Sequence, residues 1–128
     1  GEIVEYLKSV NAQFQEFKDE ELFPIIAKLI DSGKVIGWFN GPMEFGPRAL
    51  GGRSIIGDSR NQKMQSIMNL KIKYRESFRP FAPSILEEDV SNEFELDVKS
   101  PYMLLVAPIK KNNRLEMDQE QEKLFSRC

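Results

Sequence analysis

The chain has 128 residues, of which 41% are hydrophobic and 30% charged, and its formal net charge is -2. This length suits one domain or part of one, and the composition excludes an intrinsically disordered chain. The chain has no histidine and a single cysteine, Cys128, which excludes a Ser-His-Asp triad, a histidine metal site and an internal disulfide within it.

The first half of the chain predicts two helices followed by two short strands. Apolar residues at spacings of three and four predict helices over 3–17 and 22–30. We expect Pro24 in the first turn of the second helix or at a kink, and Gly33 at its C-terminal end. The β-branched and aromatic run 34–39 predicts a strand that ends in a turn at 40–42, and the run 53–56 predicts another.

The second half continues the alternation. We expect a helix over 64–72 capped by Asp58, Ser59 or Asn61, followed by extended chain over 78–86 and a short helix over 87–94. After these we expect a strand buried on both faces over 102–107, a polar turn over 110–114 and a helix over 115–125. This order predicts an α/β or α+β class and a single domain over 1–128. No apolar run approaches the ~20 residues that cross a bilayer, and no signal peptide is present, so we expect a cytoplasmic protein without a membrane partner.

The charge is unevenly distributed along the chain. Between Arg48 and Arg79 there are eight basic and two acidic residues, so this window carries +6 and the remainder -8. A basic window in an acidic chain favours a local anion site over a general polyanion-binding surface. The alternative is a solvated face with charges scattered by chance.

A glycine-rich stretch over 46–57 contains Arg48 and Arg53. Glycines let main-chain amides approach an anion, and the arginine fork binds phosphate or carboxylate with two hydrogen bonds. The stretch is not a P-loop, because Gly52 stands where that motif requires lysine. Taken alone, the pattern also fits a surface loop with solvated arginines.

A second cationic cluster, residues 71–83, mixes four cations with three aromatic residues. This mixture could hold a triphosphate while a ring stacks on a base. Positive charges also stabilise the C-terminus of a helix, and this would account for Lys71 and Lys73 at the end of the preceding helix. It would not account for Arg79, which lies beyond that helix.

These two motifs carry a family resemblance. The segment Gly-Trp-Phe-Asn-Gly-Pro-Met-Glu-Phe-Gly-Pro-Arg-Ala-Leu-Gly-Gly-Arg-Ser-Ile (37–55) resembles a signature of the O-carbamoyltransferases that modify nodulation factors and antibiotics. Lys-Tyr-Arg-Glu-Ser-Phe-Arg-Pro-Phe-Ala-Pro-Ser (73–84) is similar to the second signature of that family, and Ser-Pro-Tyr-Met (100–103) is a shorter third match. Together the matches span over half of the chain.

The resemblance implies a fold and a reaction. Such enzymes have an N-terminal Kae1-like transferase domain with a divalent metal and a C-terminal YrdC-like domain with a twisted mixed sheet and flanking helices. The latter makes carbamoyladenylate from carbamoyl phosphate and ATP, and the former passes the carbamoyl group to a hydroxyl acceptor. The motifs here place the chain in the N-terminal part of the YrdC-like domain, so we expect an incomplete domain with little or no turnover alone, and no metal site within it.

The resemblance also implies site residues. Arg48, Lys73 and Arg79 match positions that bind carbamoyl phosphate and the phosphates of the nucleotide, with Arg53 and Arg75 as possible supporting residues and no catalytic residue assigned. Two other hypotheses stay open. One is an RNA- or nucleotide-binding module without chemistry, which the acidity of the remaining chain disfavours. The other is an interaction domain whose cations are merely solvated.

Overall fold

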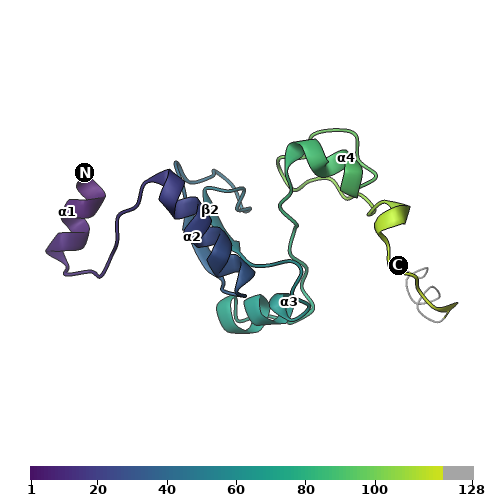
Figure 1. The fold of residues 1–128 in the computed structure, drawn as a ribbon, viewed down its shortest axis with the longest axis horizontal. Coiled ribbons are helices and arrows are strands. Elements are labelled where there is room, and N and C mark those ends of the chain that lie inside the picture. Colours follow the sequence, from purple (N-terminus) through teal and green to yellow (C-terminus); the bar gives the residue numbers. More distant parts are fainter. Residues whose placement is uncertain (120–128) are drawn as a thin grey trace. The chain divides into compact units, whose positions relative to one another are not determined.

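The computed structural model describes residues 1–119 (Figure 1). The chain divides into two compact units. The first unit comprises Gly1–Trp38 and Ser54–Arg79, and the second comprises Phe39–Arg53 and the chain from Pro80 onward. Helices together with a two-stranded sheet confirm the predicted α/β or α+β class. The described residues contribute two strands to the sheet, and the larger twisted sheet that the resemblance implies stays a prediction, as does the single domain.

The first helix is shorter than its sequence pattern predicts. Helix α1 covers Glu2–Ser9 rather than 3–17. The chain turns out of the helix at Asn11, whose φ of 52° lies in the left-handed region that asparagine tolerates. Beyond it, Phe14 and Phe17 are 38% and 43% exposed, so no buried face stabilises a continued helix there.

Helix α2 covers Asp19–Asp31 and therefore begins earlier than predicted. Pro24 lies in its second turn, so the expected place in the first turn is wrong, and the alternative of a kink stays a prediction. At the other end, Gly33 has a φ of 80° and donates its N–H to the Ile30 carbonyl over 2.9 Å, while the Lys34 N–H reaches the Leu29 carbonyl over 3.0 Å. These two bonds form a Schellman motif, which confirms Gly33 as the C-terminal stop.

Both predicted strands of the first half are formed. Strand β1 covers Ile36–Phe39, β2 covers Arg53–Ile56, and the two pair with each other. Trp38 of β1 packs against Phe23 of α2, with ring centroids 6.3 Å apart and planes tilted by 46°. This aromatic contact attaches the second helix to the sheet.

The predicted helix over 64–72 is formed in two parts. Helix α3 covers Met64–Ile67, and a π-helix, η1, continues it over Met68–Ile72. Met64 and Met68 are 4% and 5% exposed and form the hydrophobic core of the first unit. The predicted cap by Asp58, Ser59 or Asn61 is wrong, because the N-cap is Lys63 and no side chain caps the helix. Asn61 lies two residues before the N-cap, and its Oδ1 accepts the Lys63 N–H over 2.9 Å.

The chain over 79–86 has no regular structure, and a short helical segment of the second unit follows it as predicted. It consists of the 3₁₀ turn η2, Glu87–Asp89, and helix α4, Val90–Glu93. The polar turn contains a 3₁₀ turn, η3, over Lys111–Asn113, and Phe94 forms an isolated bridge with Ile109.

The predicted buried strand over 102–107 is wrong. These residues form no strand, and Leu104 and Val106 are 75% and 100% exposed. An apolar run becomes an interior strand only when neighbouring strands pair with it, and the described residues provide none. The predicted helix over 115–125 is not formed at 115–118, and 120–128 lie outside the described residues. None of the helices within 1–119 is long and apolar enough to cross a membrane.

Candidate functional site

The first candidate site is the glycine-rich loop, residues 43–53, which folds around its own carboxylate. Glu44 Oε1 accepts the main-chain N–H of Leu50 over 2.6 Å and that of Gly52 over 2.7 Å. Main-chain amides of glycine-rich loops commonly bind anions, and here a side chain of the same loop occupies that role. The carboxylate of Glu44 therefore fixes the shape of the loop.

Arg53 closes the same loop from the other end. Its Nη1 donates to the Glu44 carbonyl oxygen over 2.6 Å, and its Nη2 donates to the carbonyl oxygen of Gly46. Nη1 also lies 3.7 Å from Glu44 Oε2, an oxygen that is buried and accepts no hydrogen bond from residues 1–119. The guanidinium of Arg53 is thus directed at its own loop.

The electrostatics of Glu44 follow from these contacts. The hydrogen bond from the Leu50 N–H is the largest cause that lowers the pKa of Glu44, to about 2, from its ordinary 4.5. Its own main-chain N–H, that of Gly52 and the charge of Arg53 lower it further, while desolvation acts in the opposite direction. Glu44 is ionised at any physiological pH.

Close packing against Glu44 explains why glycine occupies position 52. A Cβ atom there would lie 2.9 Å from the Pro42 carbonyl oxygen and 3.1 Å from Glu44 Cδ. Because one of these neighbours is main chain, any side chain at this position would displace the loop.

Arg48 lies within the glycine-rich loop and differs from Arg53. Its side chain is exposed and makes no hydrogen bond or ion pair with the described part of the chain. It is therefore available to an anion in solution.

The second candidate site is the Lys73 loop, residues 73–79, which follows η1. Its first turn is strained, because Tyr74 has a φ of 50°, which side chains rarely adopt. Tyr74 is also 86% exposed. The exposed side chains of Lys73 and Arg79 have no hydrogen-bond or ion-pair partner among residues 1–119.

Asn69 in η1 holds the Lys73 loop from inside and is fully buried. Its Nδ2 donates to the carbonyl oxygens of Ser77 and Arg79, over 3.0 and 2.8 Å. Its Oδ1 accepts from Arg75 Nε over 2.7 Å, so Arg75 is engaged in the fold. Asn69 lies outside the motifs that indicated the site residues in the sequence. Its available signal was a poor helix former inside a predicted helix, directly before a cationic motif.

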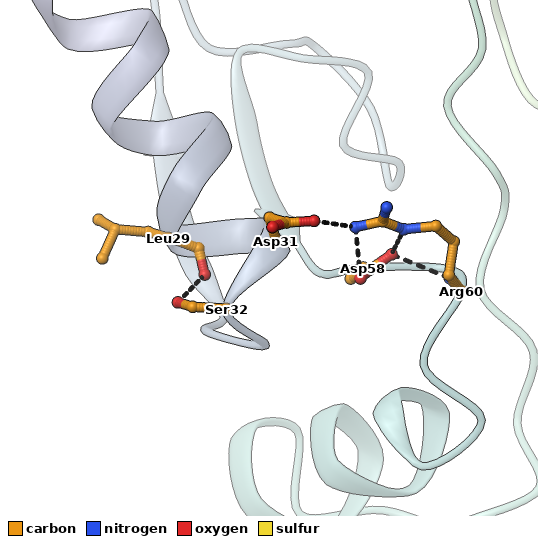
Figure 2. A network of polar contacts seen from close by, with 5 residues as sticks. All are labelled: Leu29, Asp31, Ser32, Asp58 and Arg60. Carbon is orange, nitrogen blue, oxygen red and sulfur yellow. Dashed lines mark hydrogen bonds and ion pairs between the residues drawn. The ribbon is translucent and has the colours of Figure 1, made fainter.

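A third arginine of the basic window is paired internally (Figure 2). Arg60 Nη2 lies 2.6 Å from Asp31 Oδ1, at the end of α2, and Arg60 Nε donates to Asp58 Oδ1 over 2.9 Å. These bonds lower the pKa of Asp58, chiefly through the Arg60 side chain, and raise that of Arg60. The cations of the window without a side-chain partner in the described part are Arg48, Lys63, Lys71, Lys73 and Arg79.

The structure thus places the five predicted site residues on two loops. Lys73, Arg75 and Arg79 lie in the first unit, and Arg48 and Arg53 lie in the second. Within 1–119 there is no cluster of three or more Asp, Glu, His or Cys side chains that could hold a metal ion.

Comparisons with known proteins identify the family. The model of the carbamoyltransferase C-terminus matches residues 27–121. A protein of Synechocystis sp., described as uncharacterized, is 61% identical over 126 residues, which are 97% of this chain and 20% of that protein. Nodulation protein NolNO of Sinorhizobium fredii is 47% identical over 91 residues, 69% of this chain and 13% of that protein. Nodulation protein NolO of Bradyrhizobium diazoefficiens is 49% identical over 79 residues, 62% of this chain and 14% of that protein.

The chain therefore spans a fifth or less of the length of these curated relatives. The match nevertheless includes both the glycine-rich loop and the Lys73 loop. It confirms the resemblance drawn from the motifs. The chain belongs to the carbamoyltransferase family, and the family model that it matches is that of the carbamoyltransferase C-terminus.

Proposed function

We propose that this chain is the part of an ATP-dependent O-carbamoyltransferase that binds carbamoyl phosphate and ATP. One observation carries the proposal. Within the two matched motifs, Arg53 bonds to its own loop and Arg75 bonds to Asn69 of η1, whereas the side chains of Arg48, Lys73 and Arg79 are exposed. Exposed cations without carboxylate partners can form ion pairs and hydrogen bonds with the phosphate groups of a polyanionic ligand. The family match supports a carbamoyl group as the group transferred.

The chemistry that these cations would serve is the formation of carbamoyladenylate. In that reaction water releases inorganic phosphate from carbamoyl phosphate, and an oxygen of the resulting carbamate attacks the α-phosphorus of ATP. Pyrophosphate then leaves with the electrons of the broken P–O bond. Negative charge develops on the pyrophosphate, and fixed guanidinium and ammonium groups stabilise it. Arg48 on the glycine-rich loop, and Lys73 and Arg79 on the Lys73 loop, would bind phosphate groups of the substrates and neutralise this charge.

The second half of the reaction would take place outside this chain. A Kae1-like domain with a divalent metal would pass the carbamoyl group from carbamoyladenylate to a hydroxyl acceptor. The residues proposed to act at the two loops of this chain are cations, which bind the phosphate groups directly.

The test uses the full-length protein and measures carbamoyl phosphate-dependent release of pyrophosphate from ATP. Arg48→Ala, Lys73→Ala and Arg79→Ala should each reduce kcat/KM at least about tenfold, because a hydrogen bond to a charged ligand contributes about 1.5–3 kcal/mol. Crystals soaked with ATP and carbamoyl phosphate should show phosphate density beside these side chains.

Lys63→Ala is the matched control. Lys63 lies in the same basic window, and its ammonium group has no partner among residues 1–119, but the family motifs do not include it. The proposal predicts nearly unchanged kinetics for this variant. Equal losses in all four variants would indicate a general electrostatic effect and contradict specific phosphate binding, and steeply salt-dependent binding of single-stranded RNA instead would support a nucleic-acid module.

A further inference from the structure

The side-chain amide of Asn69 fits its surroundings in one orientation only. Nδ2 points at two carbonyl oxygens, those of Ser77 and Arg79, and Oδ1 points at the guanidinium of Arg75. A flipped amide would place oxygen against the two carbonyls and nitrogen against a cation. The three bonds use both donors and one acceptor of a group with no solvent exposure.

The main chain of Asn69 adds a fourth bond to the same loop. Its carbonyl oxygen accepts the N–H of Arg75 over 3.0 Å, directly after the strained Tyr74. A residue with positive φ persists where the surrounding structure overdetermines it. Asn69 therefore fixes the Lys73 loop at three points: at Arg75 after the turn, at Ser77 in the middle and at Arg79 at its end.

Asn69 lies in the π-helix η1, directly before the loop that it contacts. In η1 the Lys73 N–H bonds to the Met68 carbonyl over 2.9 Å, five residues back, and the wider turn surrounds Asn69. Single π-helical turns are rare and frequently occur at functional sites. Gln65 of α3 reaches the same end of the loop, donating to the carbonyls of Phe78 and Arg79 over 3.1 and 3.2 Å.

We propose that Asn69 is a positioning residue for phosphate binding, acting by holding the main chain of Arg79 so that its guanidinium is presented to the ligand. This inference rests on the proposed function. Asn69 itself has no solvent exposure, so it would act without contacting the ligand. Its role is to restrict the directions that the Arg79 side chain can take, which lowers the entropy lost when the phosphate is bound.

Asn69→Asp is the informative variant. It keeps the oxygen that Arg75 contacts but replaces the amide donor with a second oxygen facing the Ser77 and Arg79 carbonyls. The experiment measures the Kd for ATP by calorimetry in the full-length protein for the wild type, Asn69→Asp, Arg79→Ala and the double variant. We expect Asn69→Asp to weaken binding roughly ten- to hundredfold, since misplacing a binding group by about 1 Å can cost that much.

The double variant separates positioning from a merely structural role. If Asn69 acts through Arg79, the double variant should bind no more weakly than Arg79→Ala alone. If the two losses instead multiply, Asn69 contributes independently of Arg79 and the inference is overturned. If Arg79→Ala alone leaves the Kd unchanged, the role of Arg79 in the proposed function is wrong and the inference falls with it.

A second variant covers the case in which Asn69→Asp fails to fold. Gln65→Met removes donors to the Phe78 and Arg79 carbonyls at an exposed position. It should weaken ATP binding by a smaller factor, about threefold, and have no effect when Arg79 is already alanine. Gln62→Met is the control, because Gln62 is exposed and bonds to nothing in the described range. If Arg79→Ala weakens ATP binding but Gln65→Met leaves the Kd for ATP unchanged, the inference is overturned.

Discussion

Arg53 contacts Glu44 twice: its Nη1 donates to the main-chain carbonyl of Glu44 over 2.6 Å and lies 3.7 Å from the Oε2 of its carboxylate. The same guanidinium also donates to the Gly46 carbonyl. One planar fork thus joins the start of the glycine-rich loop to its end. Arg53 therefore stabilises the conformation of the loop that contains Arg48.

Arg53→Lys tests this assignment, because lysine keeps the charge but cannot donate to two carbonyls in the fork geometry. We expect the loop to open more often and amide hydrogen exchange at Leu50 and Gly52 to accelerate roughly tenfold, equivalent to about 1.4 kcal/mol. Exchange measured residue by residue gives the answer, with Lys63→Ala as the control. Undisturbed protection at both amides would show that charge alone suffices.

Glu44 predicts a dependence of stability on pH. Its folded pKa of about 2 lies below its ordinary 4.5, so its ionised form stabilises the fold fully above about pH 4.5 and that contribution is lost as the pH falls through about 2. Glu44→Gln should lower the unfolding temperature at neutral pH, and the difference from the wild type should shrink as the solution is acidified. Thermal unfolding of both proteins across this range measures it.

Glu16→Gln is the matched control for that experiment. Glu16 is an exposed carboxylate that bonds to nothing in the described range. Its replacement should leave the unfolding temperature parallel to the wild type at every pH. A parallel curve for Glu44→Gln as well would contradict the role of its carboxylate in the loop.

Gly52→Ala should deform the glycine-rich loop by steric overlap, because the added carbon would meet the Pro42 carbonyl oxygen at 2.9 Å. We expect a loss of about 1–3 kcal/mol in the free energy of unfolding, the usual cost of overpacking, measured by urea titration. Gly37→Ala is the comparison, since a Cβ atom there meets nothing within 4 Å. Equal stability of the two variants would refute the close contact.

The network of Asp31, Asp58 and Arg60 predicts an order of effects (Figure 2). The Asp58 side chain is 13% exposed and accepts from the Arg60 main chain, Nε and Nη2, whereas Asp31 is 72% exposed and accepts a single bond. Asp58→Asn should therefore lower the unfolding temperature more than Asp31→Asn, whose effect should disappear at high salt. Thermal unfolding at two salt concentrations tests the order, and a larger effect of Asp31→Asn would reverse it.

Several elements could be predicted from the sequence because their causes are local. Gly33 terminates α2 through its own positive φ, and the strands β1 and β2 follow from short runs of β-branched and aromatic residues. The length of α1 could not be predicted in this way. Its periodic pattern continues to residue 17, but a pattern produces a helix only where another surface covers its apolar face.

The segment 102–107 shows the same limit for strands. Its continuous apolar residues predict an interior strand, yet the pairing that makes a strand comes from other segments, and residues 1–119 supply none. For the site, the sequence acts through its motifs. Long motifs indicated Arg48, Lys73 and Arg79 by family resemblance, and the matches confirm that family; the roles of these residues stay predictions.

By itself, the sequence determined the family, the mixed fold class and the positions of the cationic motifs, because residue order and short-range stereochemistry are sufficient for these. Only the tertiary structure decided which cations are engaged within the fold. Arg53, Arg60 and Arg75 are bound by oxygen atoms that lie between 2 and 29 residues away in the chain, whereas Arg48, Lys73 and Arg79 are not. Whether a guanidinium faces its own fold or the solvent depends on which oxygen atoms the folded chain brings within about 3 Å of it.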